Sequence, residues 1–179
     1  TQLSSLFHII MKISYNWLKQ LINIDLPLEE VCEKLTMSGL EVEHIIETES
    51  IKGGLKNLIV GEVMSKTKHP NADSLNLTTV DIGKEDLLSI VCGAKNVAVG
   101  QKVVVAPIGT KIYTESDSFK IKKAKIRGEV SEGMICAEDE IGLGLNHDGI
   151  LVLNNQIKTG TPLTDLYDVE TDQQIEIAI

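Results

Sequence analysis

The sequence predicts an α+β fold in which a five-stranded β-barrel is inserted into a small discontinuous α/β domain. Apolar residues recur at helical spacing only near the start of the chain, and short segments rich in Val, Ile and Thr occupy its middle. The flanks of the middle segment share a strongly acidic balance. At 179 residues and 42% hydrophobic composition, the chain can bury a sizeable core.

The first forty residues predict two helices. Trp17 and Leu21 follow helical spacing after Ser14, which can cap the helix. A second helix is expected from about residue 27 to 38, because Pro27 suits a first turn and Gly39 suits a stop. Alternation over residues 40–47 then predicts a strand.

From residue 58 onward the pattern predicts strands. Gly, Asn and Asp separate five segments that we expect to form the barrel strands: 58–66, 75–82, 87–92, 102–107 and 120–127. Five short strands over some 85 residues are typical of an oligonucleotide/oligosaccharide-binding (OB) barrel. A short strand near 149–153, a helical turn at 163–167 and a final strand at 175–179 complete the prediction.

Charge supports a division of the chain. Residues 58–142 hold 11 Lys and Arg against 12 Asp and Glu, whereas the flanks account for the rest of the net charge of −9. We therefore expect residues 11–50 and 154–179 to form one discontinuous domain around a barrel domain at 51–153, because inserted domains are well tolerated. Residues 1–10 are expected to be an upstream segment or an artificial addition, and the chain is expected to be cut from a longer protein.

Composition excludes several classes of protein. No apolar run approaches the ~20 residues that span a bilayer. Cys32, Cys92 and Cys136 are far apart, which argues against a structural zinc site or a disulfide framework and favours reduced thiols in a cytoplasmic protein. There is no P-loop and no Gly-x-Gly-x-x-Gly fingerprint.

A basic cluster lies in the last predicted barrel strand. Five cations fall within eight residues without an intervening acid, and on an extended strand Lys123, Lys125 and Arg127 would share one face. Such a row can follow a phosphate backbone. It can equally protect an edge strand from aggregation, and the residues leave the two readings nearly even.

The stretch at 69–75, His-Pro-Asn-Ala-Asp-Ser-Leu, and the later Cys-Gly-Ala-Lys-Asn at 92–96 resemble the tRNA-binding OB domain of several aminoacyl-tRNA synthetases. The flanks resemble one family more narrowly. Met-Lys-Ile-Ser-Tyr-Asn-Trp-Leu at 11–18 and Leu-Thr-Met-Ser-Gly-Leu-Glu-Val-Glu at 35–43 look like the start of the bacterial phenylalanyl-tRNA synthetase β subunit. Within the barrel, 125–128 and 131–136 are similar to the same subunit. The resemblance covers residues 11–179.

This resemblance implies a non-catalytic, tRNA-binding fragment of a cytoplasmic ligase. The complete enzyme would join phenylalanine to its tRNA with ATP and Mg²⁺, as an α₂β₂ assembly whose synthetic site lies on the α subunit. The fragment itself is expected to hold no cofactor, metal or catalytic residue. We expect His69 to form a structural hydrogen bond and to take no part in catalysis, since no nucleophile or carboxylate partner accompanies it in the sequence.

The expected RNA contacts are cations and amides, because the barrel segment carries only two aromatic residues for stacking. The candidates are Lys66, Lys68, Asn71, Lys95, Asn96, Lys120, Lys122, Lys123, Lys125 and Arg127. Two alternatives stay open. The barrel could be a structural or assembly element with little RNA contact, or the chain could be a free-standing tRNA-binding OB protein.

Overall fold

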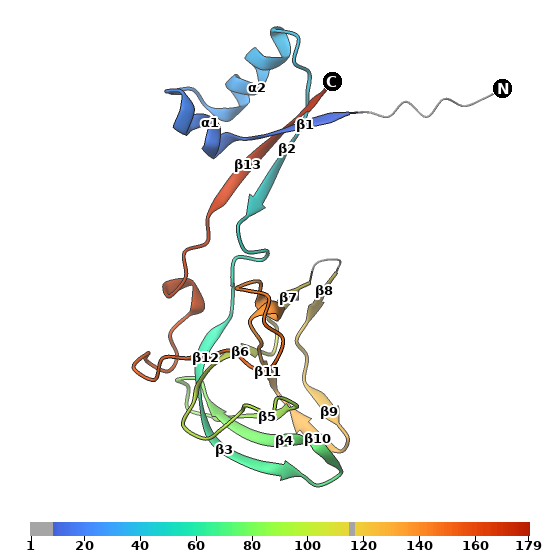
Figure 1. The fold of residues 1–179 in the computed structure, drawn as a ribbon, viewed down its shortest axis with the longest axis vertical. Coiled ribbons are helices and arrows are strands. Elements are labelled where there is room, and N and C mark those ends of the chain that lie inside the picture. Colours follow the sequence, from blue (N-terminus) through green and yellow to red (C-terminus); the bar gives the residue numbers. More distant parts are fainter. Residues whose placement is uncertain (1–8, 115–116) are drawn as a thin grey trace, which may run out of the picture. The chain divides into compact units, whose positions relative to one another are not determined.

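The computed structural model describes residues 9–114 and 117–179, and it divides into two compact units. The first unit combines residues up to Ser50 with Glu170–Ile179, and the second is Ile51–Val169. Figure 1 shows how the chain leaves the first unit after β2 and returns to it through β13. The expected barrel boundary at residue 153 therefore differs from the compact unit, which extends to Val169.

The first unit is a three-stranded antiparallel sheet with two helices. Its strands are ordered β1-β13-β2, and its elements are β1 (Ile10–Ser14), α1 (Tyr15–Leu21), α2 (Leu28–Met37), β2 (Val42–Glu49) and β13 (Thr171–Ala178). Both helices contribute to one core around Ile175 and Ile177, which are fully buried.

The local signals for these helices are confirmed. The Ser14 side chain caps α1 by accepting a hydrogen bond from the Trp17 N–H at 3.0 Å. Helix α2 follows Pro27 directly, and Gly39 beyond its end has a φ of +97°, which glycine adopts without strain. Strand β1 was missed. It begins at Ile10, inside the segment expected to be extraneous; residues 1–8 of that segment lie outside the described part of the chain.

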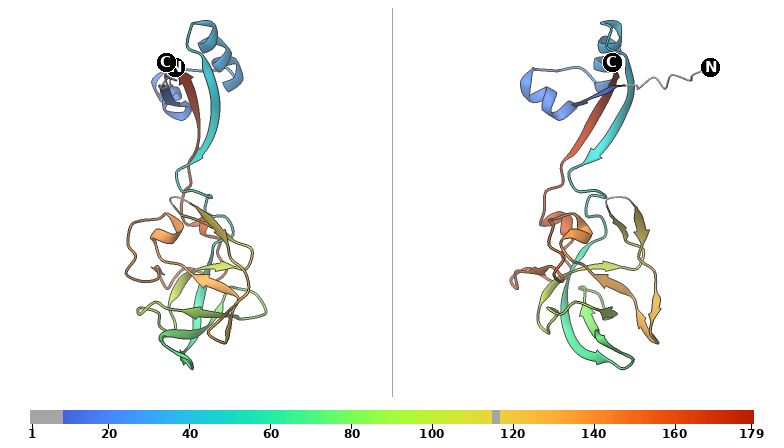
Figure 2. Two further views of the ribbon diagram at one scale, coloured as in Figure 1. Left: turned by 90° about the vertical axis from the view of Figure 1, so that its right-hand side faces the viewer. Right: turned by 45° about the vertical axis from the view of Figure 1, so that its right-hand side comes forward.

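The second unit contains a nearly closed five-stranded barrel, as predicted. Its strands are β3 (Ile59–His69), β4 (Ala72–Asp81), β5 (Leu88–Cys92), β6 (Lys102–Pro107) and β11 (Gly133–Ile135), hydrogen-bonded in the order β11-β6-β3-β4-β5. The views in Figure 2 show these strands curving around a common interior. Two hydrogen bonds link β5 to the residues just before β11: the Val91 N–H donates to the Ser131 side-chain Oγ, and the Glu132 N–H donates to the Ser89 carbonyl.

The interior of the barrel is aliphatic. Alternate side chains of β3, β4 and β6 point inward, so that Val63, Val80, Val103 and Val105 have no exposed surface. A second apolar cluster lies outside this sheet around Val60 and Val104, and Leu163 is fully buried within it. This second cluster is the reason that the unit continues past residue 153.

Smaller elements decorate the barrel. They are β7 (Lys111–Tyr113), β8 (Ser118–Lys120), β9 (Ala124–Ile126), β10 (Glu129–Ser131), η1 (Asp139–Ile141), β12 (Val152–Leu153) and η2 (Leu163–Asp165). Pairing of β7 with β8 and of β9 with β10 forms two hairpins between β6 and β11. The predicted helical turn at 163–167 is confirmed by η2.

The predicted strand at 120–127 is wrong as a single strand. Strand β8 ends at Lys120, Ile121 is buried in the core, and β9 covers only Ala124–Ile126. The chain then reverses at Arg127 and Gly128, whose φ angles are +48° and +105°, as in the two-residue turns that join β-hairpins. The fifth barrel strand is Gly133–Ile135 instead, because its segment presents apolar side chains to the interior and the basic segment does not.

Candidate nucleic-acid interface

A groove of about 440 Å³ lies between the face of β3, β4 and β5 and the β9–β10 hairpin. An OB barrel binds its ligands on this kind of surface, where its second and third strands meet the loop between the first two strands and the loop between the last two. The groove is lined by Ser65, Thr67, Leu77, Thr78, Thr79, Ser89, Ile90, Lys125, Gly128, Glu129 and Val130.

The floor of the groove is rich in hydroxyl groups. Ser65 and Thr79 lie opposite each other on β3 and β4, and their side-chain oxygens share a hydrogen bond of 2.7 Å. Thr78 also lines the groove, but its hydroxyl is buried and donates to the Ile90 carbonyl at 2.8 Å. Hydroxyls both donate and accept, so they suit phosphate oxygens and ribose hydroxyls. None of the lining residues is aromatic, so the groove offers no platform for base stacking.

Two cations sit on the hairpin without an ionic partner among the described residues. Lys125 lines the groove, and Arg127 forms the hairpin turn next to it. Both side chains are exposed. Glu129 lines the same groove and lowers its positive potential. The expectation that Lys123, Lys125 and Arg127 form one row on a strand face is wrong, because Lys123 precedes β9 and Arg127 lies in a positive-φ turn.

Lys123 is already paired. Its ammonium group lies 2.8 Å from Glu132 Oε1. This hydrogen bond, reinforced by the positive charge of Lys123, holds the pKa of Glu132 below its usual range. Lys120 and Lys122 are exposed on the approach to the hairpin, and Lys120 is in register with Lys111 across β7–β8.

The remaining predicted cations are spread around the barrel. Lys66 donates to the Val97 carbonyl at 2.6 Å, and Lys68 donates to the Asp73 carbonyl at 3.4 Å. Lys95 lines a different hollow, between the β5–β6 loop and residues 147–150. The structure thus brings Lys125 and Arg127 together at the groove, while the lysines of β3 hold neighbouring backbone and Lys95 lies elsewhere.

The two predicted asparagines are engaged with backbone groups. Asn96 Nδ2 donates to the Ile150 carbonyl at 2.9 Å, and Asn96 Oδ1 accepts from the Ile150 N–H at 3.0 Å, so both ends of its amide are satisfied. Asn71 Nδ2 donates to the Arg127 carbonyl at 3.2 Å. Direct RNA contact by these amides stays a prediction, and the geometry favours a structural role for both.

The groove hydroxyls were not among the residues expected from the sequence. Their signal was present: the hydroxyl side chains at 65 and 67 on β3, and at 79 on β4, point to one face of the sheet because side chains alternate along a strand. Serines and threonines at such positions are also ordinary solvated strand residues, so only the opposing hairpin marks them as part of a site.

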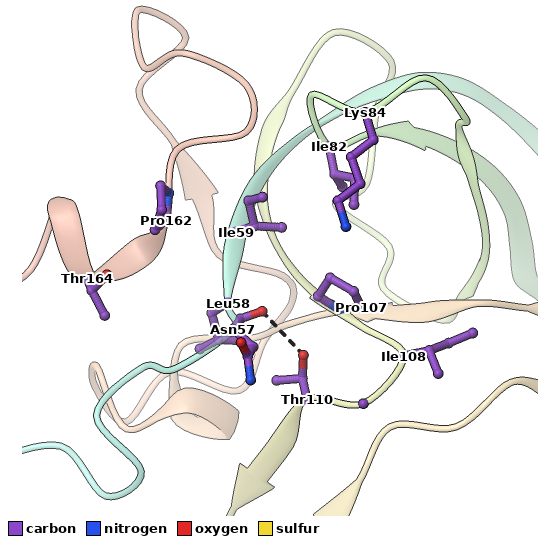
Figure 3. Close-up of a pocket in the computed structure, with 11 residues that line it drawn as sticks. Asn57, Leu58, Ile59, Ile82, Lys84, Pro107, Ile108, Thr110, Pro162 and Thr164 are labelled. Atoms are coloured by element: carbon purple, nitrogen blue, oxygen red, sulfur yellow. Dashed lines mark hydrogen bonds between the residues drawn. The ribbon is translucent and has the colours of Figure 1, made fainter.

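A second hollow of about 470 Å³ lies near the start of β3 and the β6–β7 turn (Figure 3). Thr110 donates to the Asn57 carbonyl at 3.2 Å across its floor, and Lys84 is the charged residue of its lining. Its lining contains no residue of β4 or β5, the second and third barrel strands on whose face OB barrels bind nucleic acid, so it is a weaker candidate than the groove beside the β9–β10 hairpin.

The described residues contain no group of three or more His, Cys, Asp or Glu side chains that could hold a metal ion. No helix within residues 9–114 and 117–179 has the length and hydropathy needed to cross a membrane. The three cysteines are buried and unpaired, and burial raises the pKa of each thiol.

Comparison with known proteins places the barrel in a family. Residues 58–162 match the family model described as “Putative tRNA binding domain”. The chain belongs to this family of tRNA-binding domains. The match includes every barrel strand and both hairpins, so the groove described above lies inside the family segment.

The chain is also similar to phenylalanine–tRNA ligase β subunits over most of its length. It is 53% identical to that of Bacteroides fragilis over 94% of this chain, and 52% identical to that of Bacteroides thetaiotaomicron over the same share. It is 46% identical to the β subunit of Geobacter sulfurreducens over 87% of this chain. The chain spans about a fifth of these relatives: 21%, 21% and 18% of their lengths. The solved C-terminal domain of Plasmodium vivax p43 is a distant likeness (23% identity, TM-score 0.42, 58% of this chain and 56% of that one).

Proposed function

We propose that this tRNA-binding domain belongs to the β subunit of a phenylalanine–tRNA ligase, and that it holds tRNA by its sugar–phosphate backbone without taking part in catalysis. In the complete enzyme, ATP and Mg²⁺ would serve the joining of phenylalanine to tRNA, and an α subunit would be the protein partner. The high identity to β subunits supports this family, since it runs through both units of the chain. A free-standing barrel would need no similarity outside the barrel.

The observation that carries the tRNA role is the groove beside the β9–β10 hairpin. It combines hydroxyl groups with Lys125, has Arg127 at its end, and lies within the matched segment. Contacts of this kind position a nucleic acid without reading its sequence. We therefore expect similar affinity for phenylalanine tRNA and for other tRNAs.

The competing proposal, an assembly element with little RNA contact, draws support from charge. The barrel unit has 14 Lys and Arg against 15 Asp and Glu, and the other unit is strongly acidic. Binding through a few phosphates in such a field should be weak and salt-sensitive. An absence of binding at low salt would favour the assembly role.

The experiment is a salt titration of tRNA binding by the whole chain, followed by fluorescence anisotropy. We expect log K to fall against log[salt] with a slope near −3, which corresponds to about four phosphates by the single-strand rule. In the double variant Lys125→Glu/Arg127→Glu, the slope should shrink by about 1.4 and the affinity should drop on the order of tenfold or more.

A matched control changes the charge equally elsewhere on the barrel unit. Lys84→Glu/Lys158→Glu alters two exposed lysines, one of which lines the second hollow. We expect this control variant to lose much less affinity for tRNA than Lys125→Glu/Arg127→Glu. Equal losses would show that net charge alone governs binding, and a larger loss in the control would move the interface to the second hollow; either result refutes the assignment of the groove.

A further inference from the structure

The turn between β3 and β4 is attached to the turn of the β9–β10 hairpin. His69 ends β3, and its Nε2 lies 3.0 Å from the Ile126 carbonyl oxygen. Asn71 follows in the turn, and its Nδ2 donates to the carbonyl of Arg127 at 3.2 Å. Two side chains of one turn thus bind two consecutive carbonyls of the other.

The hydrogen bonds define the state of the imidazole. The backbone N–H of Asn71 donates to His69 Nδ1 at 3.0 Å, so this nitrogen is an acceptor and carries no proton. The proton is then on Nε2, which donates to Ile126. The neutral ring is satisfied at both nitrogens, and His69 is only 4% exposed. It therefore has no free nitrogen to offer a nucleic acid.

The turn end of the hairpin needs such an attachment. Strands β9 and β10 have three residues each and pair with one another. The base of the hairpin is held against β5, where the Val91 N–H donates to Ser131 Oγ, but beyond this base a short two-stranded hairpin is marginally stable in water. Its turn is formed by Arg127 and Gly128, and the φ of +105° at Gly128 favours glycine. A Cβ at Gly128 would lie in ordinary van der Waals contact with Asn71 Nδ2, at 3.5 Å. The hairpin turn therefore lies directly against the side chain of Asn71.

We infer that His69 and Asn71 are positioning residues: they fix the β9–β10 hairpin so that Lys125 and Arg127 stand over the groove, and they do not themselves contact RNA. This inference rests on the proposed function, because it assigns these two residues to the assembly of the same tRNA site. It replaces direct RNA contact by Asn71 with an indirect role.

The test compares His69→Leu, which removes both ring hydrogen bonds, with His69→Gln, which retains a donor for the Ile126 carbonyl. Wild type, both variants and Asn71→Ala are titrated with tRNA over a range of salt after circular dichroism has shown that they are folded. We expect His69→Leu to lose on the order of tenfold in affinity and to lower the salt slope by about 0.7 to 1.4, as one or two phosphate contacts are lost. His69→Gln should recover part of the lost affinity and part of the lost salt dependence.

A double-mutant cycle separates positioning from a general loss of stability. Lys125→Gln should weaken binding in the wild type and have little further effect in His69→Leu, since the lysine is then no longer held over the groove. His147→Leu is the matched control: His147 is 77% exposed, pairs with Asp139 and lies outside the groove, so its loss should leave affinity, slope and the effect of Lys125→Gln unchanged.

The outcomes distinguish the two proposals. If the wild type binds tRNA and folded His69→Leu keeps its affinity, its slope and its sensitivity to Lys125→Gln, the positioning role is refuted while the tRNA role stands. If the wild type fails to bind at low salt, both are refuted. Should His69→Leu not fold, Asn71→Ala decides by the same three readouts, because it removes one bond between exposed groups.

Discussion

Leu163 tests whether residues after 153 belong to the barrel unit. Its side chain is fully buried among apolar residues of that unit, and its N–H donates to the Leu58 carbonyl at 2.9 Å. Leu163→Ala removes three carbons, worth about 0.8 kcal/mol each in transfer free energy. The cavity left behind adds to this loss, so we expect the free energy of unfolding to fall by about 3–4 kcal/mol.

Urea unfolding of the whole chain measures this loss by far-UV circular dichroism. With a slope of roughly 2 kcal/mol per molar urea, the midpoint should move down by about 1.5–2 M. Leu145→Ala is the matched control, because it is the same chemical change at a leucine that is 96% exposed, and it should cost under about 0.5 kcal/mol. Similar midpoints for the two variants would refute the assignment of Leu163 to the barrel core.

The other predictions concern the boundary of the barrel unit and the cysteines. A chain truncated after residue 153 should lose the cooperative unfolding of the barrel, whereas a chain truncated after residue 169 should retain it. The reason is that residues 160–163 form backbone hydrogen bonds with Val60, in β3, and with Leu58 just before it. Cooperative unfolding of both truncated chains would contradict this prediction. Because burial raises their pKa, all three thiols should resist alkylation at pH 8 in the folded protein and react fully in denaturant. Rapid labelling of the native chain, counted by mass spectrometry, would show that one of them is accessible.

The elements that the sequence predicted well are those with strong local signals. The cap at Ser14, the stop at Gly39 and the alternating apolar residues of β3, β4 and β6 act within a few residues of themselves, so a linear pattern contains the necessary information. The prediction failed at 120–127, where a buried Ile121 interrupts the strand and a turn begins at Arg127, although the stretch looks uniform when only its charges are considered.

The family resemblance and the barrel could therefore be recognised from the amino-acid sequence, including the basic segment that bears on RNA. The sequence alone could not show which cations are free to bind RNA, because this depends on their partners in the folded chain. Glu132 pairs with Lys123, and the Val97 carbonyl accepts a hydrogen bond from Lys66. The groove itself is lined by strands and a hairpin from distant parts of the chain, and the two bonds between residues 69–71 and the β9–β10 turn span 57 and 56 residues. Contacts between residues so far apart leave no periodic trace in the sequence, and it is the folded barrel that brings them together.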